Sequence, residues 1–185
     1  MADAVRAYPL FAACGLNCGL CPRFHTVGSS RCPGCAGAGF TAVHPPCGVL
    51  SCSLRKGVEH CALCGEYPCK KYDGAGLTDS FITHRNRIRD LDRAKAMGMT
   101  AYAAELDEKI GLLKYLLDNC DDGRRKGFYC LAVNLLDIDD VRNVYRQAAD
   151  TGDIPVKAKA AAVVRLFEDA AAKKDIELKL RKKIG

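Results

Sequence analysis

Ten of the twelve cysteines lie between positions 14 and 69, and their spacing is typical of metal ligands. They are Cys14, Cys18, Cys21, Cys32, Cys35, Cys47, Cys52, Cys61, Cys64 and Cys69. Three pairs have two residues between the cysteines, a step that lets two thiolates on one tight turn face one ion. In CPGCAG and CALCGE a glycine follows the second cysteine closely, which leaves backbone N–H groups free to donate to the thiolate sulfurs. We therefore predict that these ten residues bind zinc.

Ten thiolates exceed the needs of two four-ligand sites by two, so we expect about two structural zinc ions and two spare thiols. A sequential grouping would combine Cys14 or Cys18 with Cys21, Cys32 and Cys35, and Cys47, Cys52 and Cys61 with Cys64 or Cys69. A cross-braced arrangement would interleave the pairs, and the spacing does not decide between the two. His60, next to Cys61, could replace a thiolate, but a histidine at a helix end is more often a surface residue.

The segment CGLNCGLC allows an alternative to zinc. Cys14, Cys18 and Cys21 form C-x3-C-x2-C, a spacing that can hold three irons of a four-iron cluster. A radical enzyme built around such a cluster would need alternating strands and helices, which this sequence does not predict. An iron–sulfur protein that carries electrons or acts as a sensor needs only four thiolates and a partly dry pocket.

The remaining chemistry-bearing residues do not form a recognisable catalytic site. Cys130 follows Arg124, Arg125 and Lys126, which would lower the pKa of its thiol, but it lies in the apolar run FYCLAVNLL, where a free cysteine is usually a core residue. Cys120 stands beside carboxylates that disfavour a thiolate. The chain has no phosphate loop, nucleophile elbow or dinucleotide fingerprint. We expect a binding or adaptor protein, rather than an enzyme, whose partner is another protein.

The character of the sequence changes near position 73, between the segment that holds the ten cysteines and the segment that follows it. Glycine and proline interrupt the chain throughout residues 14–72, so this segment cannot bury an adequate apolar core. Metal binding, at roughly 10–16 kcal/mol per structural zinc, is the available source of folding energy. We predict a mainly α protein with a cysteine-rich metal-binding module of little regular structure over residues 1–73, apart from a helical turn at 53–60, and a bundle of about five helices over residues 74–185.

Capping residues and apolar periodicity indicate where these five helices lie. The first should run from Thr78 to about Met97, and the second should begin at Thr100. The third, at 128–136, is short and very apolar and should be central to the bundle. The fourth should begin at Asp137 or Asp139 and the last at Pro155.

The net charge of +6 comes mainly from the end of the chain, since residues 173–183 hold six bases and two acids. Such a segment is most often a solvated helix end, so nucleic-acid binding by this tail is a weaker second alternative. The first dozen residues lack the features of a secretory signal, and no stretch has the roughly 18 consecutive apolar residues of a membrane span. We expect a cytoplasmic protein without membrane contact, in which the thiols stay reduced.

The order of these motifs also resembles a known family. CGLNCGLCP, then CPGC, then a C-x4-C pair running into LRKGVEHCALCGEYPCKKY, is similar to a cysteine-rich prokaryotic family called domain of unknown function 3795. The resemblance covers about residues 11–72 and includes all ten cysteines. It implies a small cytoplasmic protein presumed to bind zinc through them, and it implies no particular activity.

Overall fold

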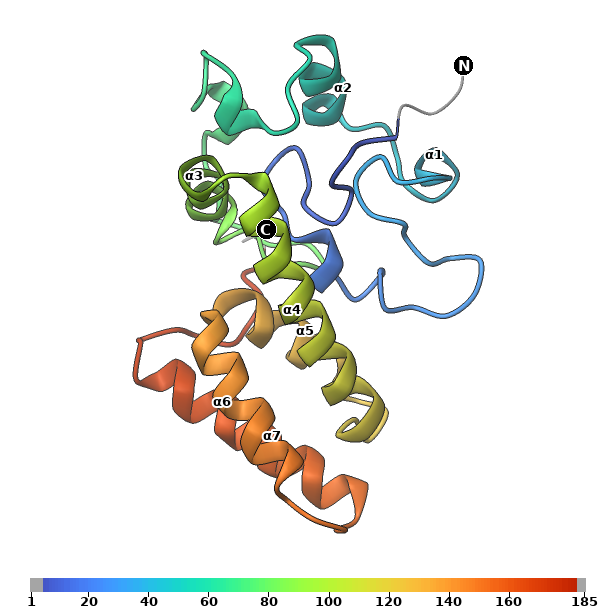
Figure 1. The fold of residues 1–185 in the computed structure, drawn as a ribbon, viewed down its shortest axis with the longest axis vertical. Coiled ribbons are helices and arrows are strands. Elements are labelled where there is room, and N and C mark those ends of the chain that lie inside the picture. Colours follow the sequence, from blue (N-terminus) through green and yellow to red (C-terminus); the bar gives the residue numbers. More distant parts are fainter. Residues whose placement is uncertain (1–4, 183–185) are drawn as a thin grey trace.

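The computed structural model describes residues 5–182 of the 185-residue chain. These residues form seven α-helices and three single turns of 3-10 helix, without a β-strand, so the prediction of a mainly α fold is confirmed. Figure 1 shows the cysteine-rich lobe (residues 5–73) at one end, the pair α6 and α7 at the other, and the long helix α4 running between them.

The cysteine-rich lobe consists largely of loops. It contains the helices α1 (Phe40–Val43) and α2 (Gly48–Arg55) and the 3-10 turns η1 (Cys18–Leu20), η2 (Cys61–Leu63) and η3 (Lys70–Tyr72). The helical turn expected at 53–60 was therefore placed too late in the chain. Helix α2 begins at Gly48 and ends before Gly57, whose φ of +63° is a conformation that glycine adopts without strain.

The second half of the chain forms the five helices that the sequence predicts. They are α3 (Arg87–Met97), α4 (Met99–Asn119), α5 (Lys126–Leu135), α6 (Ile138–Ala149) and α7 (Val156–Ala172). All residues of α5 from Tyr129 to Leu135 are buried, which confirms its central position. Asp137 precedes α6 and Pro155 precedes α7, as expected from their capping preferences.

The predicted start of the first of these helices was wrong, because residues 78–86 form a loop. The carboxylate of Asp79 accepts hydrogen bonds from the backbone N–H of His84 (2.6 Å) and the hydroxyl of Thr83 (3.2 Å). Such local side-chain bonds offer the backbone an alternative to the helical ladder. The helix begins only at Arg87, nine positions after the Thr78 cap that the sequence suggests.

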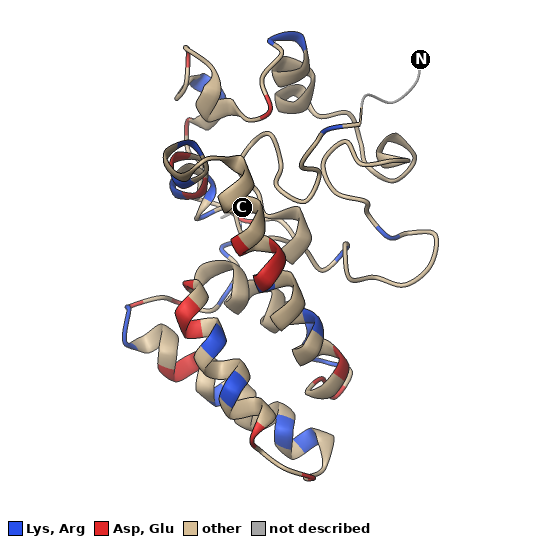
Figure 2. Ribbon diagram, viewed as in Figure 1, with Lys and Arg blue, Asp and Glu red and all other residues tan. Residues whose placement is uncertain are grey.

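The basic segment after α7 is largely exposed, as expected, but it is not helical. It is extended and is hydrogen-bonded to the loop at 78–86: Asp79 and Arg181 exchange two bonds of 2.8 Å, and the Arg85 guanidinium donates to the carbonyl oxygens of Glu177 (2.7 Å) and Lys179 (3.0 Å). Figure 2 shows positive and negative residues interspersed along α4, α6 and α7 and few charges in the cysteine-rich loops. The tail is therefore part of the folded structure.

One hydrophobic core joins the lobe to the helices. Phe11 and Leu20 from the lobe are buried in the same cluster as Leu91 of α3, Leu113 of α4 and Phe167 of α7. The lobe has a second, separate cluster with few large side chains, made of Ala12, Ala13, Cys35, Ala36, Phe40 and Leu50. One side of the lobe thus rests on the core of the bundle, whereas the side that holds this cluster has little apolar packing. The described helices are all too short or too polar to cross a membrane.

Candidate metal centre

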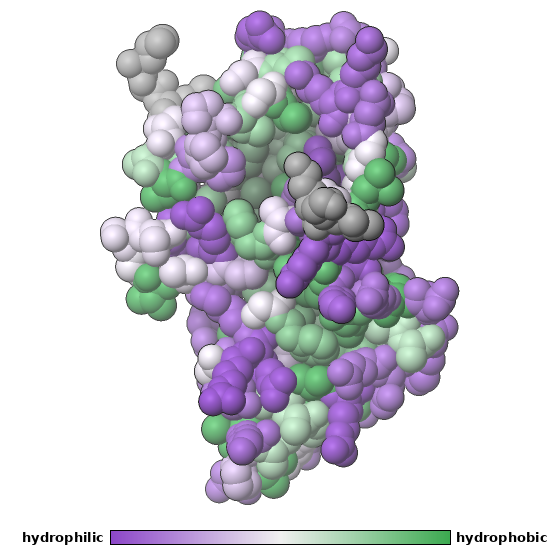
Figure 3. All heavy atoms as spheres, turned by 180° about the vertical axis from the view of Figure 1, so that it is seen from behind, coloured by the Kyte–Doolittle hydropathy of each residue, from purple (hydrophilic) through white to green (hydrophobic). Residues whose placement is uncertain are grey.

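Six of the predicted ligands line one cavity of about 280 Å³, here called the six-thiol cavity. They are Cys14, Cys18, Cys21, Cys32, Cys35 and Cys47. The rest of its wall is mostly apolar, including Ala12, Leu16, Phe40 and Ile82. In the view of Figure 3, a recess with hydrophobic residues is visible in the upper half of the molecule, which contains the cysteine-rich lobe.

Tight turns bring these cysteines to the cavity. In η1 the backbone N–H of Cys21 donates to the carbonyl of Cys18 (3.1 Å), so the two thiols lie on one turn. The backbone N–H of Cys35 donates to the carbonyl of Pro9 (2.7 Å), which ties the second C-x2-C pair to the start of the lobe. Gly15, with φ of +89°, packs directly on the carbonyl oxygen of Arg87, where no other side chain fits. The Arg87 guanidinium in turn donates from Nε to the carbonyl of Cys14 (3.1 Å).

The other four predicted ligands line a second and smaller cavity of about 60 Å³, here called the four-thiol cavity. They are Cys52, Cys61, Cys64 and Cys69. Cys52 belongs to α2, and η2 repeats the turn of η1, with the N–H of Cys64 donating to the carbonyl of Cys61 (2.9 Å). The N–H of Cys61 donates to the carbonyl of Ala13 (2.9 Å), so a hydrogen bond ties η2 to the segment just before Cys14.

The four-thiol cavity also has polar neighbours that the spacing of the cysteines does not reveal. Tyr67, Tyr72 and Lys56 line it. Burial raises the pKa of the Cys61 thiol, and the nearby Tyr72 hydroxyl, which is buried without a hydrogen-bond partner, opposes this effect. Lys56 forms a 2.5 Å ion pair with Glu66 at the rim. A thiolate in this cavity would therefore have a hydroxyl donor and a cation close to it.

Burial raises the pKa of several thiols of the six-thiol cavity. The effect is largest for Cys18, whose pKa lies well above its usual range because of burial and of the neighbouring charges of Cys35, Cys14, Cys21 and Cys32. Burial also raises the pKa of the Cys14, Cys21 and Cys35 thiols. These groups need a cation in the cavity to become thiolates at neutral pH, as metal ligands do when they bind an ion and release protons.

The ten cysteines fall into two groups in sequence order, with the six from Cys14 to Cys47 in one cavity and the four from Cys52 to Cys69 in the other. The sequential grouping combined Cys47 with the later cysteines, whereas Cys47 faces the six-thiol cavity. Both thiols in excess of four-ligand sites lie in that cavity. All twelve cysteines are free thiols, and among residues 5–182 no three His, Cys, Asp or Glu side chains are arranged as the ligands of one ion. The thiols are donors that suit thiophilic metals such as zinc, and the two cavities offer room for an ion, but the thiols of each cavity must move closer together to bind it.

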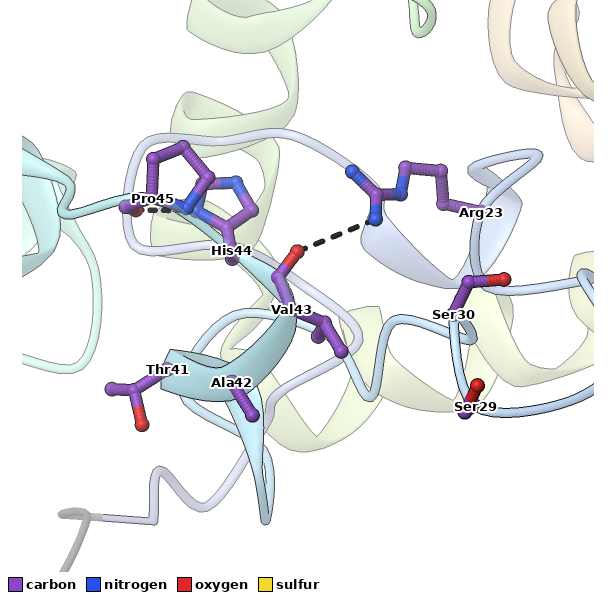
Figure 4. A pocket seen from close by; sticks show the side chains of 8 residues that line it. All are labelled: Arg23, Ser29, Ser30, Thr41, Ala42, Val43, His44 and Pro45. Carbon is purple, nitrogen blue, oxygen red and sulfur yellow. Dashed lines mark hydrogen bonds between the residues drawn. The ribbon is translucent and has the colours of Figure 1, made fainter.

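Sequence reasoning missed several residues around the six-thiol cavity. The cavity is also lined by Arg23, His44, Ser80 and His84. His44 stands three positions before Cys47, and this spacing could have marked His44 as a residue of the site. Arg23 and His44 also line an open hollow of about 500 Å³ on the outer side. Figure 4 shows this hollow, in which the Arg23 guanidinium reaches the carbonyl of Val43 (3.3 Å). These two side chains therefore form part of the wall of both spaces.

Three other residues singled out in the sequence lie away from both cavities or in the core. His60 is not a surface residue as expected: it is 1% exposed, and its ring makes an edge contact with Phe11 at 5.9 Å. It lines neither cavity. Cys130 is buried in α5, and burial raises the pKa of its thiol to about 12, which makes it a core residue and not a nucleophile. Cys120 is fully buried as well.

The fold and the site define a class: a cysteine-rich, mainly helical protein whose thiols meet in two separate cavities beside a five-helix bundle. Residues 10–74 match the model of a family described as Protein of unknown function (DUF3795). The resemblance seen in CGLNCGLCP and KGVEHC is thereby confirmed over this segment. No curated protein matches the chain. No solved structure matches it either.

Proposed function

We propose that this protein binds zinc through the ten clustered cysteines and that the ions have a structural role. The observation that supports the proposal most directly is that all ten, from four separate motifs, face one of two cavities as free thiols. In a reducing compartment, cysteines this dense are typical of metal binding rather than of disulfides. Cys52, Cys61, Cys64 and Cys69 would hold one ion, and the six-thiol cavity would hold the rest of the metal.

The apolar packing of the lobe supports a structural role for the metal. Its own hydrophobic cluster contains only two large side chains, Phe40 and Leu50, among its buried members. Clusters of this size contribute little to stability, because the hydrophobic effect scales with buried apolar area. Zinc has no redox chemistry and binds four thiolates tightly, so an ion would link loops that packing leaves weakly connected.

The biological role that we propose is that of a binding or adaptor protein in the cytoplasm, with another protein as the partner. The sequence has no phosphate loop, nucleophile elbow or dinucleotide fingerprint that would indicate catalysis. The lobe exposes a few apolar side chains, among them Val27, which is 95% exposed, Leu54 and Leu63. Charges of both signs are mixed on the helices (Figure 2), an arrangement that does not favour a polyanion such as nucleic acid.

An iron–sulfur centre is the second candidate, and one observation favours it. Cys14, Cys18 and Cys21, the three cysteines with iron–sulfur spacing, all line the six-thiol cavity, which is mostly apolar. A dry cavity of thiols suits a cluster that carries electrons or senses oxidants. The two candidates differ in colour, since iron–sulfur proteins absorb visible light and zinc–thiolate sites do not.

Purification without oxygen, followed by elemental analysis, tests the proposal. We expect colourless protein that contains zinc and no stoichiometric iron. The anaerobic step is essential because zinc can replace a cluster lost in air. Brown protein with iron and labile sulfide would show that the iron–sulfur candidate is correct, and protein without bound metal would contradict both candidates.

A further inference from the structure

We propose that the six-thiol cavity holds two zinc ions bridged by two cysteine sulfurs, so that the chain binds three ions and not two. This inference rests on the zinc-binding function proposed above. It concerns the number of ions and the way they share ligands, neither of which follows from the family match or from the spacing of the cysteines.

The number of thiols in the cavity supports a bridged pair. A single tetrahedral zinc ion uses four thiolates, which would leave two of the six thiols facing the ion without binding it. Two ions that share two sulfurs are each four-coordinate and use all six. The bridged pair carries a net charge of about −2, the same as one ion with four thiolates. The net charge that must be buried is therefore the same for the bridged pair as for a single four-thiolate site.

The two cavities of the same molecule provide an internal comparison of size. The four-thiol cavity has a volume of about 60 Å³ and the donor set of one ion, whereas the six-thiol cavity has about 280 Å³. A metal–thiolate centre forms a close shell of sulfur around the metal, so a larger ring of donors encloses more metal. The six-thiol cavity therefore has room for more than one ion.

The positions of the thiols indicate which two sulfurs are shared. Cys18 lies within electrostatic range of Cys14, Cys21, Cys32 and Cys35. Cys14 lies near Cys18 and Cys35 and is also the neighbour of Cys47. Because bridging sulfurs contact both ions, these two central residues are the expected bridges.

The remaining four cysteines then divide into two pairs of terminal ligands. Cys21 has Cys32 as a neighbour, whereas Cys47 is a neighbour of Cys14. Cys21 and Cys32 would complete the ligands of one ion, and Cys35 and Cys47 would complete those of the other. Each ion would thus link residues from different motifs.

Cations placed around the cavity would compensate the charge of the centre. The Arg87 guanidinium donates to the carbonyl of Cys14 (3.1 Å) and the Arg6 guanidinium to the carbonyl of Cys35 (3.5 Å), so both cations lie beside cysteines of the cavity. Arg23 is part of the wall. Arginines beside a buried dianion reduce the free-energy cost of its desolvation.

Elemental analysis of the wild-type protein, with cobalt substitution, tests this inference. We expect about three zinc ions per chain. In the full chain loaded with Co²⁺, shared sulfurs should couple two of the three cobalt spins, so that the electron paramagnetic resonance signal corresponds to about one ion. The substitution Cys69→Ser in the four-thiol cavity should remove one ion and leave only the coupled pair, whose signal is nearly silent.

The possible outcomes separate the inference from the proposed function. Two zinc ions per chain, or three cobalt ions with additive signals, would show that no bridged pair exists, while zinc binding itself would stand. Iron, or no metal at all, would overturn both. The wild-type measurements need no variant, so they decide the matter even if Cys69→Ser fails to fold.

Discussion

The side-chain amide of Asn17 donates a 2.8 Å hydrogen bond to Oδ2 of Asp90, which lies 73 positions later in helix α3. Asn17 immediately precedes Cys18, and both Asn17 and Asp90 are buried. The hydroxyl of Tyr102 in α4 donates to Oδ1 of the same amide (2.9 Å), and Asn134 of α5 is the third partner, at 3.3 Å. A buried polar group therefore fixes the first turn of thiols relative to three helices.

Replacing Asn17 by alanine should destabilise the protein by about 2–4 kcal/mol, because Asp90 and Tyr102 would lose a buried partner. Chemical denaturation of the zinc-loaded protein measures this change. Asn143, which is exposed on α6, is the matched control, and Asn143→Ala should have little effect or a slight stabilising one. Equal effects of the two substitutions would contradict the role given to the network.

The buried side chain of Lys109 should make the stability of the protein depend on pH in the alkaline range. It is buried in α4 and donates to the carbonyl oxygens of Val133 (3.2 Å) and Leu136 (2.6 Å) at the end of α5. Burial lowers its pKa from 10.5 to about 8, although the charge of Asp90 opposes the shift. Between these pH values the unfolded chain binds more protons than the folded one, so the free energy of unfolding should increase with pH.

The increase due to Lys109 should total about 3 kcal/mol between pH 8 and pH 10.5, since each pKa unit corresponds to about 1.4 kcal/mol. Lys109→Met removes the titrating group and serves as the reference, because tyrosines and other lysines titrate alike in both proteins. Denaturation across this pH range should show wild-type stability rising relative to that of the variant. A constant difference would mean that the lysine titrates equally in both states.

Gly15 should not tolerate a side chain. Its φ of +89° is unfavourable for other residues, and a Cβ atom would collide with the carbonyl oxygen of Arg87 and the side chain of Leu91. We expect Gly15→Ala to cost at least about 2 kcal/mol and to lower the zinc content of the six-thiol cavity. The control is Gly111→Ala in α4, where a Cβ would meet no atom within 4 Å. That change should stabilise the protein by about 0.5–1 kcal/mol.

Chelation should loosen part of the lobe without unfolding the bundle. The loops around the two cavities should depend on bound metal for their structure, whereas Phe11 and Leu20 are held in the common core with the helices. Hydrogen exchange after treatment with a chelator should increase in residues 32–69 and change little in α4 and α5, and far-ultraviolet circular dichroism should keep most of its helical signal. Exchange that increases uniformly, or not at all, would rule out metal as the local source of stability.

Much of the fold was predictable because it depends on local interactions. The five helices follow from capping residues and from apolar periodicity, and the turns at Cys18–Leu20 and Cys61–Leu63 follow from C-x2-C spacing. The loop at 78–86 was not predictable in this way. Asp79 bonds to its own loop and also to Arg181, a partner 102 positions away, and propensity cannot anticipate such a contact.

The sequence by itself determined that ten cysteines are spaced as metal ligands and that a helical bundle follows them. Only the tertiary structure decided how the cysteines divide. Helix α2 begins directly after Cys47 and contains Cys52, so one short helix directs the two residues to different cavities. The division into six and four depends on the position of α2, whose Leu50 is buried in one cluster with Ala12 and Phe40, and long-range packing of this kind leaves no trace in the spacing of the cysteines.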